Sequence, residues 1–185
     1  MPVASHHRPG DAVPAGLDVP DAAAFRAAMG RFPTGVTMLT QGSGDATTAM
    51  TLNSLVSVSL DPLLVLVSVK GKGRIRPRIV RAGSFAVNLL GQHHQDLALD
   101  FARPDRPVGA AAMARLAAVA GGTGNAVMPS ATAALECLLH AEVEAGDHVL
   151  LIGRVATIHT GDPGTPPLVF HRGGFTRLAH TEELP

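Results

Sequence analysis

The feature that most constrains the fold is a pair of long strand-like segments that follow each other closely. Residues 133–144 and 149–160 are both strand candidates, and the short turn Ala145-Gly146-Asp147 lies between them. A tight turn that contains glycine joins strands that run antiparallel. The sequence therefore predicts a long antiparallel hairpin in the C-terminal third of the chain.

Further strand candidates fill the chain at short spacing. The run Leu63–Val69 is almost continuously apolar and of strand length, so we expect both of its faces to be buried. The other candidates are residues 36–40, 47–51, 54–60, 85–90 and 167–178, with a turn over residues 41–45. Because these strands do not alternate with helices, the expected fold class is mainly β: an antiparallel barrel with a few appended helices.

Helical patterns are few. Asp18-Val-Pro-Asp21 is typical of a helix start, and Pro33 ends that helix. Its apolar stripe consists of Val19, Phe25, Met29 and Phe32. A short helix over residues 92–101 should turn Leu97, Ala98 and Phe101 inward, and one helical turn is expected around residues 111–118. Residues 1–17 show no periodicity and predict a disordered tail, which leaves a single domain over residues 18–180.

Composition excludes several function classes. The 185-residue chain is 46% hydrophobic and 16% charged, which is typical of a globular protein. Fifteen Lys and Arg balance fifteen Asp and Glu, and Trp and Tyr are absent, so neither nucleic acid nor an anionic membrane is an expected partner. The single cysteine, Cys137, has apolar neighbours, which predicts a buried, inert thiol. Because no export signal and no membrane-spanning run is apparent, we expect a cytoplasmic protein.

Common catalytic fingerprints are missing from the sequence. It contains no P-loop, no Gly-x-Gly-x-x-Gly after a strand and no Gly-x-Ser-x-Gly. The nine histidines form no ligand set with the one cysteine or with a carboxylate. No metal site is therefore predicted.

Three stretches carry more polarity than a structural strand needs. Residues 47–54 offer hydroxyls and an amide that suit a planar heterocycle with several carbonyl groups, or they form an ordinary Thr-rich strand end. Residues 70–78 combine glycines with five cations, which suits an anion such as phosphate or a solvated basic loop. Residues 146–148 and 170–173 place a histidine and an arginine near strand ends, where such side chains are usually surface residues.

Six segments, taken together and in order, resemble the short-chain flavin reductase family, which contains the reductase partners of two-component flavin monooxygenases. They are Phe25-Arg-x-x-Met-Gly-x-Phe-Pro-Thr-Gly-Val-Thr37, Met50-Thr-x-Asn-Ser54, Ser57-x-Ser-Leu-Asp-Pro62, Phe85-Ala-Val-Asn-x-Leu90, Gly146-Asp-His-x-x-x-Ile-Gly-Arg-Val155 and Pro167-Leu-x-Phe-His-Arg-Gly173. The resemblance covers nearly the whole chain outside its two ends.

This resemblance implies a homodimeric FMN-binding split barrel that takes FMN or FAD. In the family, the segment matching Thr48–Ser54 contacts the flavin ring and its ribityl chain, which assigns Thr48, Ala49, Met50, Thr51, Asn53 and Ser54. The segment matching Ser68–Ile75 holds the phosphate side, which assigns Ser68, Val69, Lys70, Gly71, Lys72, Gly73 and Arg74. The stretch after the helix, Ala102 and Arg103, also lies near the flavin.

The same resemblance implies NADH or NADPH as the hydride donor to the flavin. The positions that face the nicotinamide nucleotide are His148, Phe170, His171, Arg172 and Gly173. His148 is the candidate catalytic residue, since it would orient the nicotinamide, and Arg172 would make a charge contact. Reduced flavin would then leave for a flavin-dependent monooxygenase. The alternatives are a flavin-binding accessory protein without reductase activity and, less favoured, a haem-binding barrel with an exposed histidine as axial ligand.

One departure from the family concerns the phosphate loop. Gly73-Arg-Ile75 stands where family members usually have Ser-x-Thr or Ser-x-Ser, so two hydroxyl donors are missing. Either Lys72, Arg74 and backbone amides compensate by charge, or the flavin is held loosely.

Overall fold

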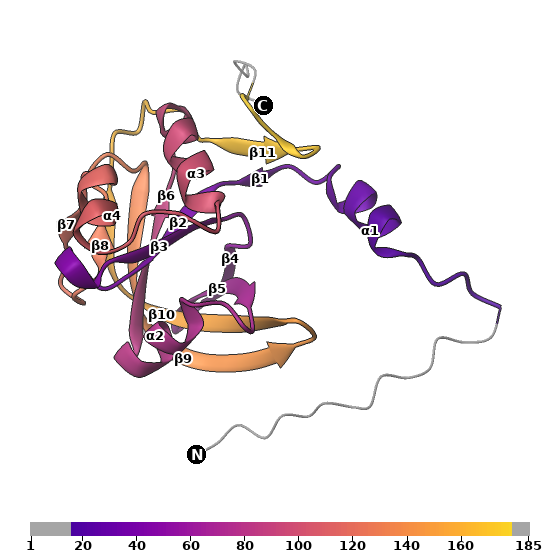
Figure 1. Ribbon diagram of the computed structural model, residues 1–185, viewed down its shortest axis with the longest axis horizontal. Coiled ribbons are helices and arrows are strands. Elements are labelled where there is room, and N and C mark those ends of the chain that lie inside the picture. Colours follow the sequence, from indigo (N-terminus) through magenta and orange to yellow (C-terminus); the bar gives the residue numbers. More distant parts are fainter. Residues whose placement is uncertain (1–15, 179–185) are drawn as a thin grey trace.

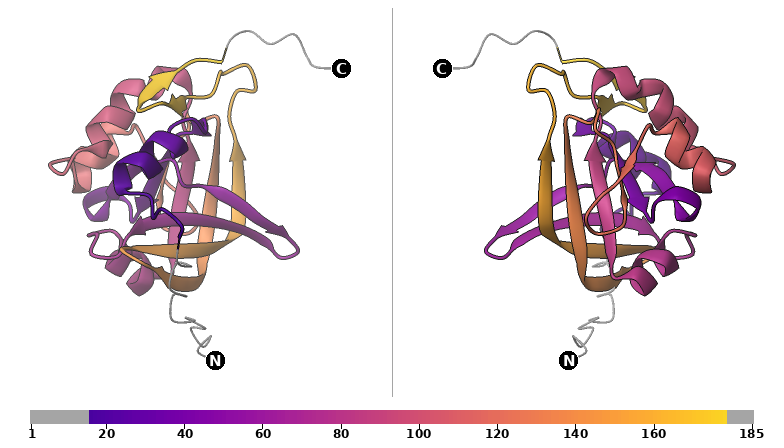
Figure 2. Two further views of the ribbon diagram at one scale, coloured as in Figure 1. Left: turned by 90° about the vertical axis from the view of Figure 1, so that its right-hand side faces the viewer. Right: turned by 90° about the vertical axis from the view of Figure 1, so that its left-hand side faces the viewer.

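A seven-stranded antiparallel sheet dominates the computed structural model, which describes residues 16–178. Figures 1 and 2 show this sheet curled into an incomplete barrel. In spatial order its strands are β3 (Thr48–Leu52), β2 (Thr37–Gln41), β6 (Ser84–Leu89), β9 (Ala133–Ala145), β10 (His148–Thr160), β5 (Leu63–Lys70) and β4 (Val56–Leu60). The mainly β fold class predicted from the sequence is confirmed.

Smaller elements surround the barrel. One small sheet contains β1 (Thr34–Gly35), β11 (Val169–His171) and β12 (Gly174–Thr176), and another contains β7 (Val119–Ala120) and β8 (Ala126–Val127). The helices are α1 (Ala22–Met29), α2 (Arg76–Ala82), α3 (Gln95–Ala102) and α4 (Gly109–Arg115), with 3-10 turns at Gly44–Ala46 and Gln92–His94.

The long hairpin predicted for the C-terminal third is the β9–β10 pair. The two strands pair from Ala133↔Thr160 to Ala145↔His148, with irregularities at two points of the register. Gly146 occupies the first central position of the turn with φ +64°, which is the conformation that a two-residue type II′ hairpin requires there. The predicted hairpin is therefore confirmed, with each strand one residue longer at the turn than the pattern indicates.

Two apolar clusters bury the two faces of β2. Inside the barrel, Leu39 packs in one cluster with Val67, Phe85, Cys137 and Leu151. Outside it, the cluster of Met38 includes Ala98 and Phe101 of α3, Ala112 of α4 and Leu116 at the end of α4. Burial raises the pKa of the Cys137 thiol to about 12, with a contribution from the charge of Glu136. The thiol is therefore buried and unreactive, as its apolar neighbours predict.

The prediction that both faces of residues 63–69 are buried is wrong for a single chain. Along β5 the buried residues Val65, Val67 and Val69 alternate with partly exposed ones, and Leu63 is 44% exposed. The reason is that β5 forms a hairpin with β4 that extends away from the body of the barrel (Figure 2). Only the inward face of β5 meets the core.

The C-terminal strand prediction also needs correction. Residues 167–178 form the hairpin β11–β12 rather than one strand. Arg172 and Gly173, at the two central turn positions, have φ +50° and +80°, a combination found in two-residue type I′ turns.

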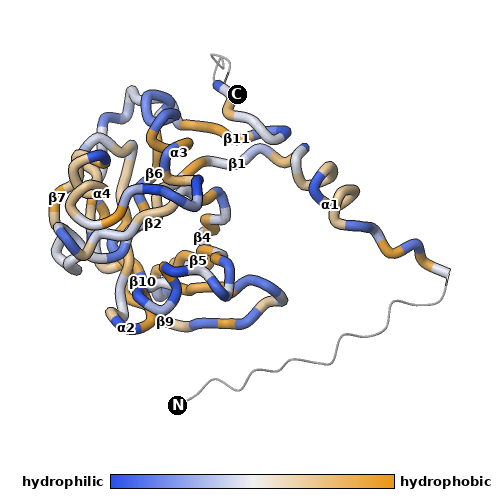
Figure 3. The backbone as a smooth tube through the Cα atoms, in the orientation of Figure 1, coloured by the Kyte–Doolittle hydropathy of each residue, from blue (hydrophilic) through white to orange (hydrophobic). Residues whose placement is uncertain are grey.

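Helix α1 forms as predicted, and the Asp21 side chain caps it by accepting a hydrogen bond from the Ala24 N–H at 2.7 Å. None of its residues is buried. Figure 1 shows α1 projecting from the barrel, and Figure 3 shows that it carries both polar and apolar residues. Among residues 16–178, nothing covers the apolar stripe found in the sequence.

Some expectations fall on residues outside 16–178, including most of the tail over residues 1–17 and the last two residues of the domain over residues 18–180. Within the described part of the chain, no helix is long and apolar enough to cross a membrane.

Candidate functional site

Because the barrel is incomplete, its sheet has two edge strands, and these two strands are consecutive in the sequence. Among the described residues β3 pairs only with β2, and β4 pairs only with β5, so these strands are the two edges of the sheet. Residues 53–55 connect them. An edge strand presents unpaired backbone N–H and C=O groups along its free side. The free side of β3 is therefore a row of fixed donors and acceptors, and it contains the residues assigned to the flavin ring.

Ser54 closes one end of the split between these edges. Its hydroxyl donates to the Ser68 carbonyl and accepts from the Ser68 N–H, both at 3.0 Å. Two residues of the predicted site, one from each flavin-binding segment, are thus brought into direct contact.

At the other end, Thr48 and Arg74 line one cleft of about 370 Å³. Two further arginines line the same cleft: Arg78, on α2, and Arg106, between α3 and α4. The split therefore begins at the Ser54–Ser68 contact and ends in a cleft rich in guanidinium groups.

Helix α3 and the segment that follows it form one side of the split. Arg74 Nη2 donates to the Pro104 carbonyl at 2.6 Å, and Thr51 Oγ1 donates to the Ala98 carbonyl at 2.7 Å. Ala102 and Arg103, which were assigned to the flavin, are both exposed beside these contacts. The structure thus gathers the segments 48–54, 68–74 and 102–104, although they lie far apart in the sequence.

Most hydroxyl and amide groups of the predicted ring-binding segment already have partners. Thr51 and Ser54 donate to backbone carbonyls, and Asn53 Nδ2 donates to Thr34 Oγ1 at 3.1 Å. Thr48 is an exception, because its hydroxyl makes no hydrogen bond to any group of residues 16–178. The donors left for a ligand are the Thr48 hydroxyl and the backbone groups at the free edge of β3.

His148 lies on the other side of the same loop. It pairs with Lys70 in the β5–β10 register, and its Nδ1 lies 2.8 Å from Asp147 Oδ1. A hydrogen bond and the charge of His148 lower the pKa of Asp147. His148 and the loop residues Lys70 and Lys72 line a separate hollow of about 480 Å³. His148 is accessible, next to cations and held by a carboxylate.

The remaining predicted site residues, Phe170–Gly173, are not brought near His148 within one chain. Phe170 and His171 lie on β11, at the top of Figure 1, whereas the β9–β10 turn lies near the bottom, and Figure 2 shows the same separation. Arg172 instead lines a hollow of about 590 Å³ together with Arg26 and Arg31.

Sequence reasoning missed Asp45, Arg78 and Arg106 as residues of the cleft. Arg78 belongs to the basic stretch over residues 70–78, but the sequence could not say which of its cations meet. Arg76, for example, forms an ion pair with Glu142 of β9 and is therefore held against the sheet. Nothing in the sequence indicated a role for Arg106, because its loop shows no motif and no hydrophobic periodicity.

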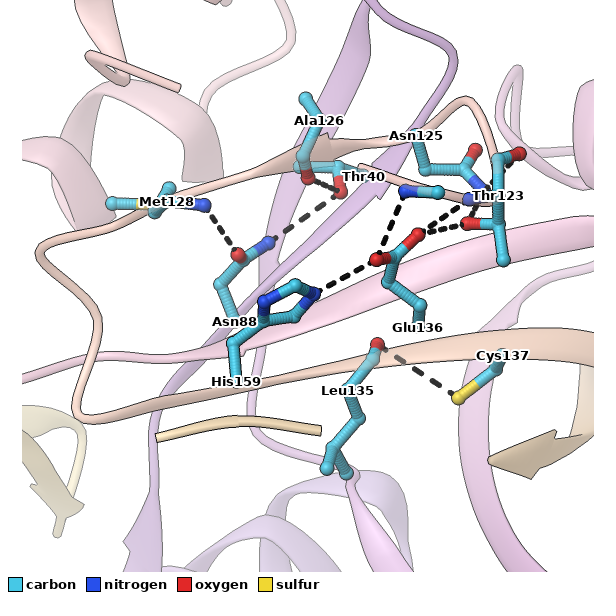
Figure 4. Close-up of polar contacts among 11 residues, drawn as sticks. Thr40, Asn88, Thr123, Asn125, Ala126, Met128, Leu135, Glu136, Cys137 and His159 are labelled. Atoms are coloured by element: carbon cyan, nitrogen blue, oxygen red, sulfur yellow. Dashed lines mark hydrogen bonds and ion pairs between the residues drawn. The ribbon is translucent and has the colours of Figure 1, made fainter. Parts of the chain in front are cut away.

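A buried carboxylate lies outside the split (Figure 4). Glu136, on β9, is 1% exposed and accepts hydrogen bonds from the Thr123 hydroxyl and N–H, both at 2.6 Å, and from the Gly122 N–H at 3.1 Å. His159 Nε2 lies 2.8 Å from its Oε1. Burial raises the pKa of Glu136, but the hydrogen bonds from Thr123, His159 and Gly122 outweigh it and lower the pKa to about 2. Glu136 ties the β7–β8 connection to the sheet.

Within residues 16–178, no group of three or more His, Cys, Asp and Glu side chains is arranged to hold a metal ion.

Comparison with known proteins identifies the family of the chain. Residues 29–179 match the family described as "Flavin reductase like domain", which is most of the chain and includes every segment of the split. The chain belongs to this family. The match begins at the last residue of α1 and ends just beyond the last described residue.

Individual relatives of this flavin reductase-like domain are also similar over most of their length. The NADH-dependent FMN reductase AsuE2 of Streptomyces nodosus subsp. asukaensis is 49% identical over 154 residues, 83% of each chain. The reductase component of 4-hydroxyphenylacetate 3-monooxygenase from Thermus thermophilus is 34% identical, over 84% of this chain and 95% of the relative.

A solved structure agrees with these relatives. The NADH:FAD oxidoreductase SgcE6 of Streptomyces globisporus, in complex with NAD and FAD fragments, superposes with a TM-score of 0.78 at 35% identity. That superposition covers 86% of this chain and 94% of SgcE6.

Proposed function

We propose that this protein is an NADH- or NADPH-dependent flavin reductase that transfers a hydride from the nicotinamide to FMN or FAD. The observation that carries the proposal is that its similarity to FMN and FAD reductases extends over nearly their whole length and over every segment of the split. A flavin-binding accessory protein without reductase activity is the alternative that the experiment below distinguishes.

The residues of the split fit a flavin. A flavin ring has N–H and C=O groups along one edge, which match the alternating donors and acceptors of a free strand edge. The Thr48 hydroxyl is an unused donor, and the cleft at the end of the split is lined by three arginines. A flavin nucleotide, whose ring is joined to a phosphate by a short chain, matches this arrangement of a free strand edge followed by a cationic cleft. The predicted flavin-binding residues, 48–54, 68–74 and 102–103, thus remain our proposal for the site.

The chain contributes position and electrostatics to the reaction. When bound, the flavin supplies the ring that accepts the hydride. Backbone N–H groups on the free edge of β3 would donate to the side of the ring where negative charge increases on reduction, which favours the reduced form. The walls formed by β3, the β5–α2 loop and residues 102–104 would hold the ring in one orientation, which removes most of the entropic barrier to hydride transfer.

His148 and the hairpin residues Phe170–Gly173 are our proposed contacts to the nicotinamide nucleotide. His148 is half exposed and lies beside Lys70 and Lys72, so the diphosphate of a nicotinamide nucleotide finds cations there. Arg172, with Arg26 and Arg31, offers a second cationic surface. No side-chain nucleophile or general base is required for hydride transfer.

We further propose that the protein is a homodimer. Helix α1 exposes Phe25 and Met29 at 61% and 50%, and Phe32, just after the helix, is 64% exposed. Strand β4 exposes Val56, Val58 and Leu60 at 51%, 48% and 84%. Apolar surfaces of this kind are typical of protein interfaces, and a second copy would also cover the outward face of β5.

The biological setting follows from the relatives. Since one of them is the reductase component of a monooxygenase, we propose that reduced flavin leaves this protein for a separate flavin-dependent monooxygenase. We place the protein in the cytoplasm, because its single cysteine is unpaired and buried. Residues 18–180 would form its single domain.

Steady-state assays with purified full-length protein test the reductase function. Oxidation of NADH or NADPH, followed at 340 nm, should depend on added FMN or FAD for at least one of the four combinations. No turnover in any combination would refute the reductase function. Flavin binding without turnover would favour the accessory-protein alternative.

A further inference from the structure

The phosphate loop of this chain has no place for the hydroxyl groups that it lacks. Gly73 lies in a turn where its N–H donates to the Lys70 carbonyl at 2.8 Å, and a Cβ at this position would lie 2.8 Å from the same oxygen. Ile75 is 1% exposed and packs in the barrel core with Val69 and Phe85. A side chain at position 73 would collide with backbone, and one at position 75 points into the core. Donors for a phosphate must come from elsewhere.

Three arginines converge where those donors are needed. Arg74, Arg78 and Arg106 come from the β5–α2 loop, α2 and the α3–α4 loop, and all line the cleft of about 370 Å³. Each guanidinium is fixed by a backbone carbonyl: Arg74 by Pro104 at 2.6 Å, Arg78 by Ala46 at 2.6 Å and Arg106 by Arg103 at 3.0 Å. Because a guanidinium has five N–H donors, several remain for a ligand.

The charge of this cleft is not balanced by the protein. None of the three arginines takes part in an ion pair among residues 16–178, and Asp45 is the one carboxylate that lines the cleft. Burial and the charge of Arg74 both lower the pKa of Arg106. Like charges held together in this way are stabilised by an anion between them, and three arginines against one aspartate match the two negative charges of a phosphate monoester.

The position of the cleft along the split agrees with the length of a flavin nucleotide. Thr48 lines the cleft, and Thr51 lies three residues further along β3, which is about 10 Å at the usual rise of a strand. A five-carbon ribityl chain separates the flavin ring from its first phosphate. A ring beside the C-terminal half of β3 would therefore place that phosphate at the cleft.

We propose that Arg74, Arg78 and Arg106 bind the phosphate next to the ribityl chain and make the protein select flavin nucleotides over riboflavin. This proposal rests on the proposed reductase function and names the groups that recognise its flavin. Positive charge takes the place of the hydroxyl donors that the family resemblance leads us to expect in the loop.

Binding measurements without nicotinamide test the proposal. The full-length protein is titrated with riboflavin, FMN and FAD, and quenching of flavin fluorescence gives each affinity. FMN and FAD should bind at least about tenfold more tightly than riboflavin. Arg106→Gln and Arg78→Gln should each weaken FMN and FAD about tenfold, while riboflavin changes by less than about twofold. Arg81→Gln, an exposed arginine on α2 that does not line the cleft, should change none of the three affinities.

The outcomes separate this proposal from others. Equal affinity of the wild-type protein for riboflavin and FMN would overturn it, as would variants that weaken riboflavin and FMN alike. An FAD affinity that resists both substitutions would also contradict it, because FAD contains the same first phosphate. Arg78 also supports the β2–β3 turn through Ala46, whereas Arg106 makes its hydrogen bond within its own loop, so Arg106→Gln keeps the test independent of folding.

Different results would refute the reductase function and the arginine cleft. Normal selection of FMN over riboflavin, with no NADH or NADPH oxidation by any flavin, would refute the reductase function and leave the arginine cleft standing. Turnover with equal KM values for FMN and riboflavin would support the reductase function and refute the role of the arginine cleft.

Discussion

The type of a residue does not show whether its side chain is free to bind a ligand or is already used to hold the fold. Thr51 and Ser54 resemble ligand-binding hydroxyls in the sequence, yet both donate to backbone carbonyls of the chain itself. Arg78 and Arg106 had no assigned role, yet they line the cleft. Which donor is free depends on neighbours that are distant in sequence, so it could not be read from the residue alone.

His148 offers a test at the scale of one residue. Because it lies beside Lys70 rather than in the arginine cleft, His148→Ala should raise KM for the nicotinamide nucleotide about fivefold or more and leave KM for flavin unchanged. Steady-state kinetics with each substrate varied in turn give both constants. His140→Ala, at an exposed position on β9, serves as the matched control. An unchanged nicotinamide KM would make His148 a turn residue without a role in binding.

Glu136 offers a second test, of stability. Since its pKa falls from 4.5 to about 2 on folding, its carboxylate stabilises the folded protein above pH 4.5, and this contribution is lost as the pH falls towards 2. Glu136→Gln removes a buried acceptor of several hydrogen bonds and should cost roughly 2–4 kcal/mol at neutral pH.

Urea unfolding at a series of pH values measures this contribution. The difference between the wild-type protein and Glu136→Gln should be constant above about pH 5 and shrink in more acidic solution. Glu144→Gln, at an exposed position of the same strand, should have little effect. A difference that grows on acidification would contradict the assignment.

At the scale of elements, the sequence predicts what depends on local pattern. The β9–β10 hairpin, β6 and α3 follow from runs of apolar residues and from turn glycines. The sequence does not predict features that depend on contacts between segments that are distant along the chain. β7 and β8 are two residues each, too short for a pattern, and β5 exposes one face because no described residue covers it. The family resemblance predicted which segments form the site, but it did not predict that three arginines lie together in one cleft.

The exposed apolar residues on α1 and β4 predict the behaviour of these elements in solution. The wild-type protein should sediment as a dimer at micromolar concentration, and Val58→Lys should shift it towards monomer, because a buried charge would oppose association. Ala111→Lys, at an exposed position of α4, should leave the dimer intact. A monomeric wild-type protein would refute the proposed homodimer.

For the molecule as a whole, function arises where the sheet fails to close. Seven strands curl into a barrel whose two edge strands, β3 and β4, are neighbours in sequence. Closing the barrel would pair the free edge of β3 and remove the donors that we assign to the ring. The Ser54–Ser68 contact and the arginine cleft mark the two ends of the opening. The apolar clusters on both sides of β2 also pack against β3, through Leu52 on one side and Ala49 on the other.

A crystal structure of the protein grown with FMN tests this account most directly. It should show the ring along the free edge of β3, with its phosphate within hydrogen-bonding distance of Arg78 and Arg106. Well-ordered FMN bound elsewhere, with the split empty, would contradict it.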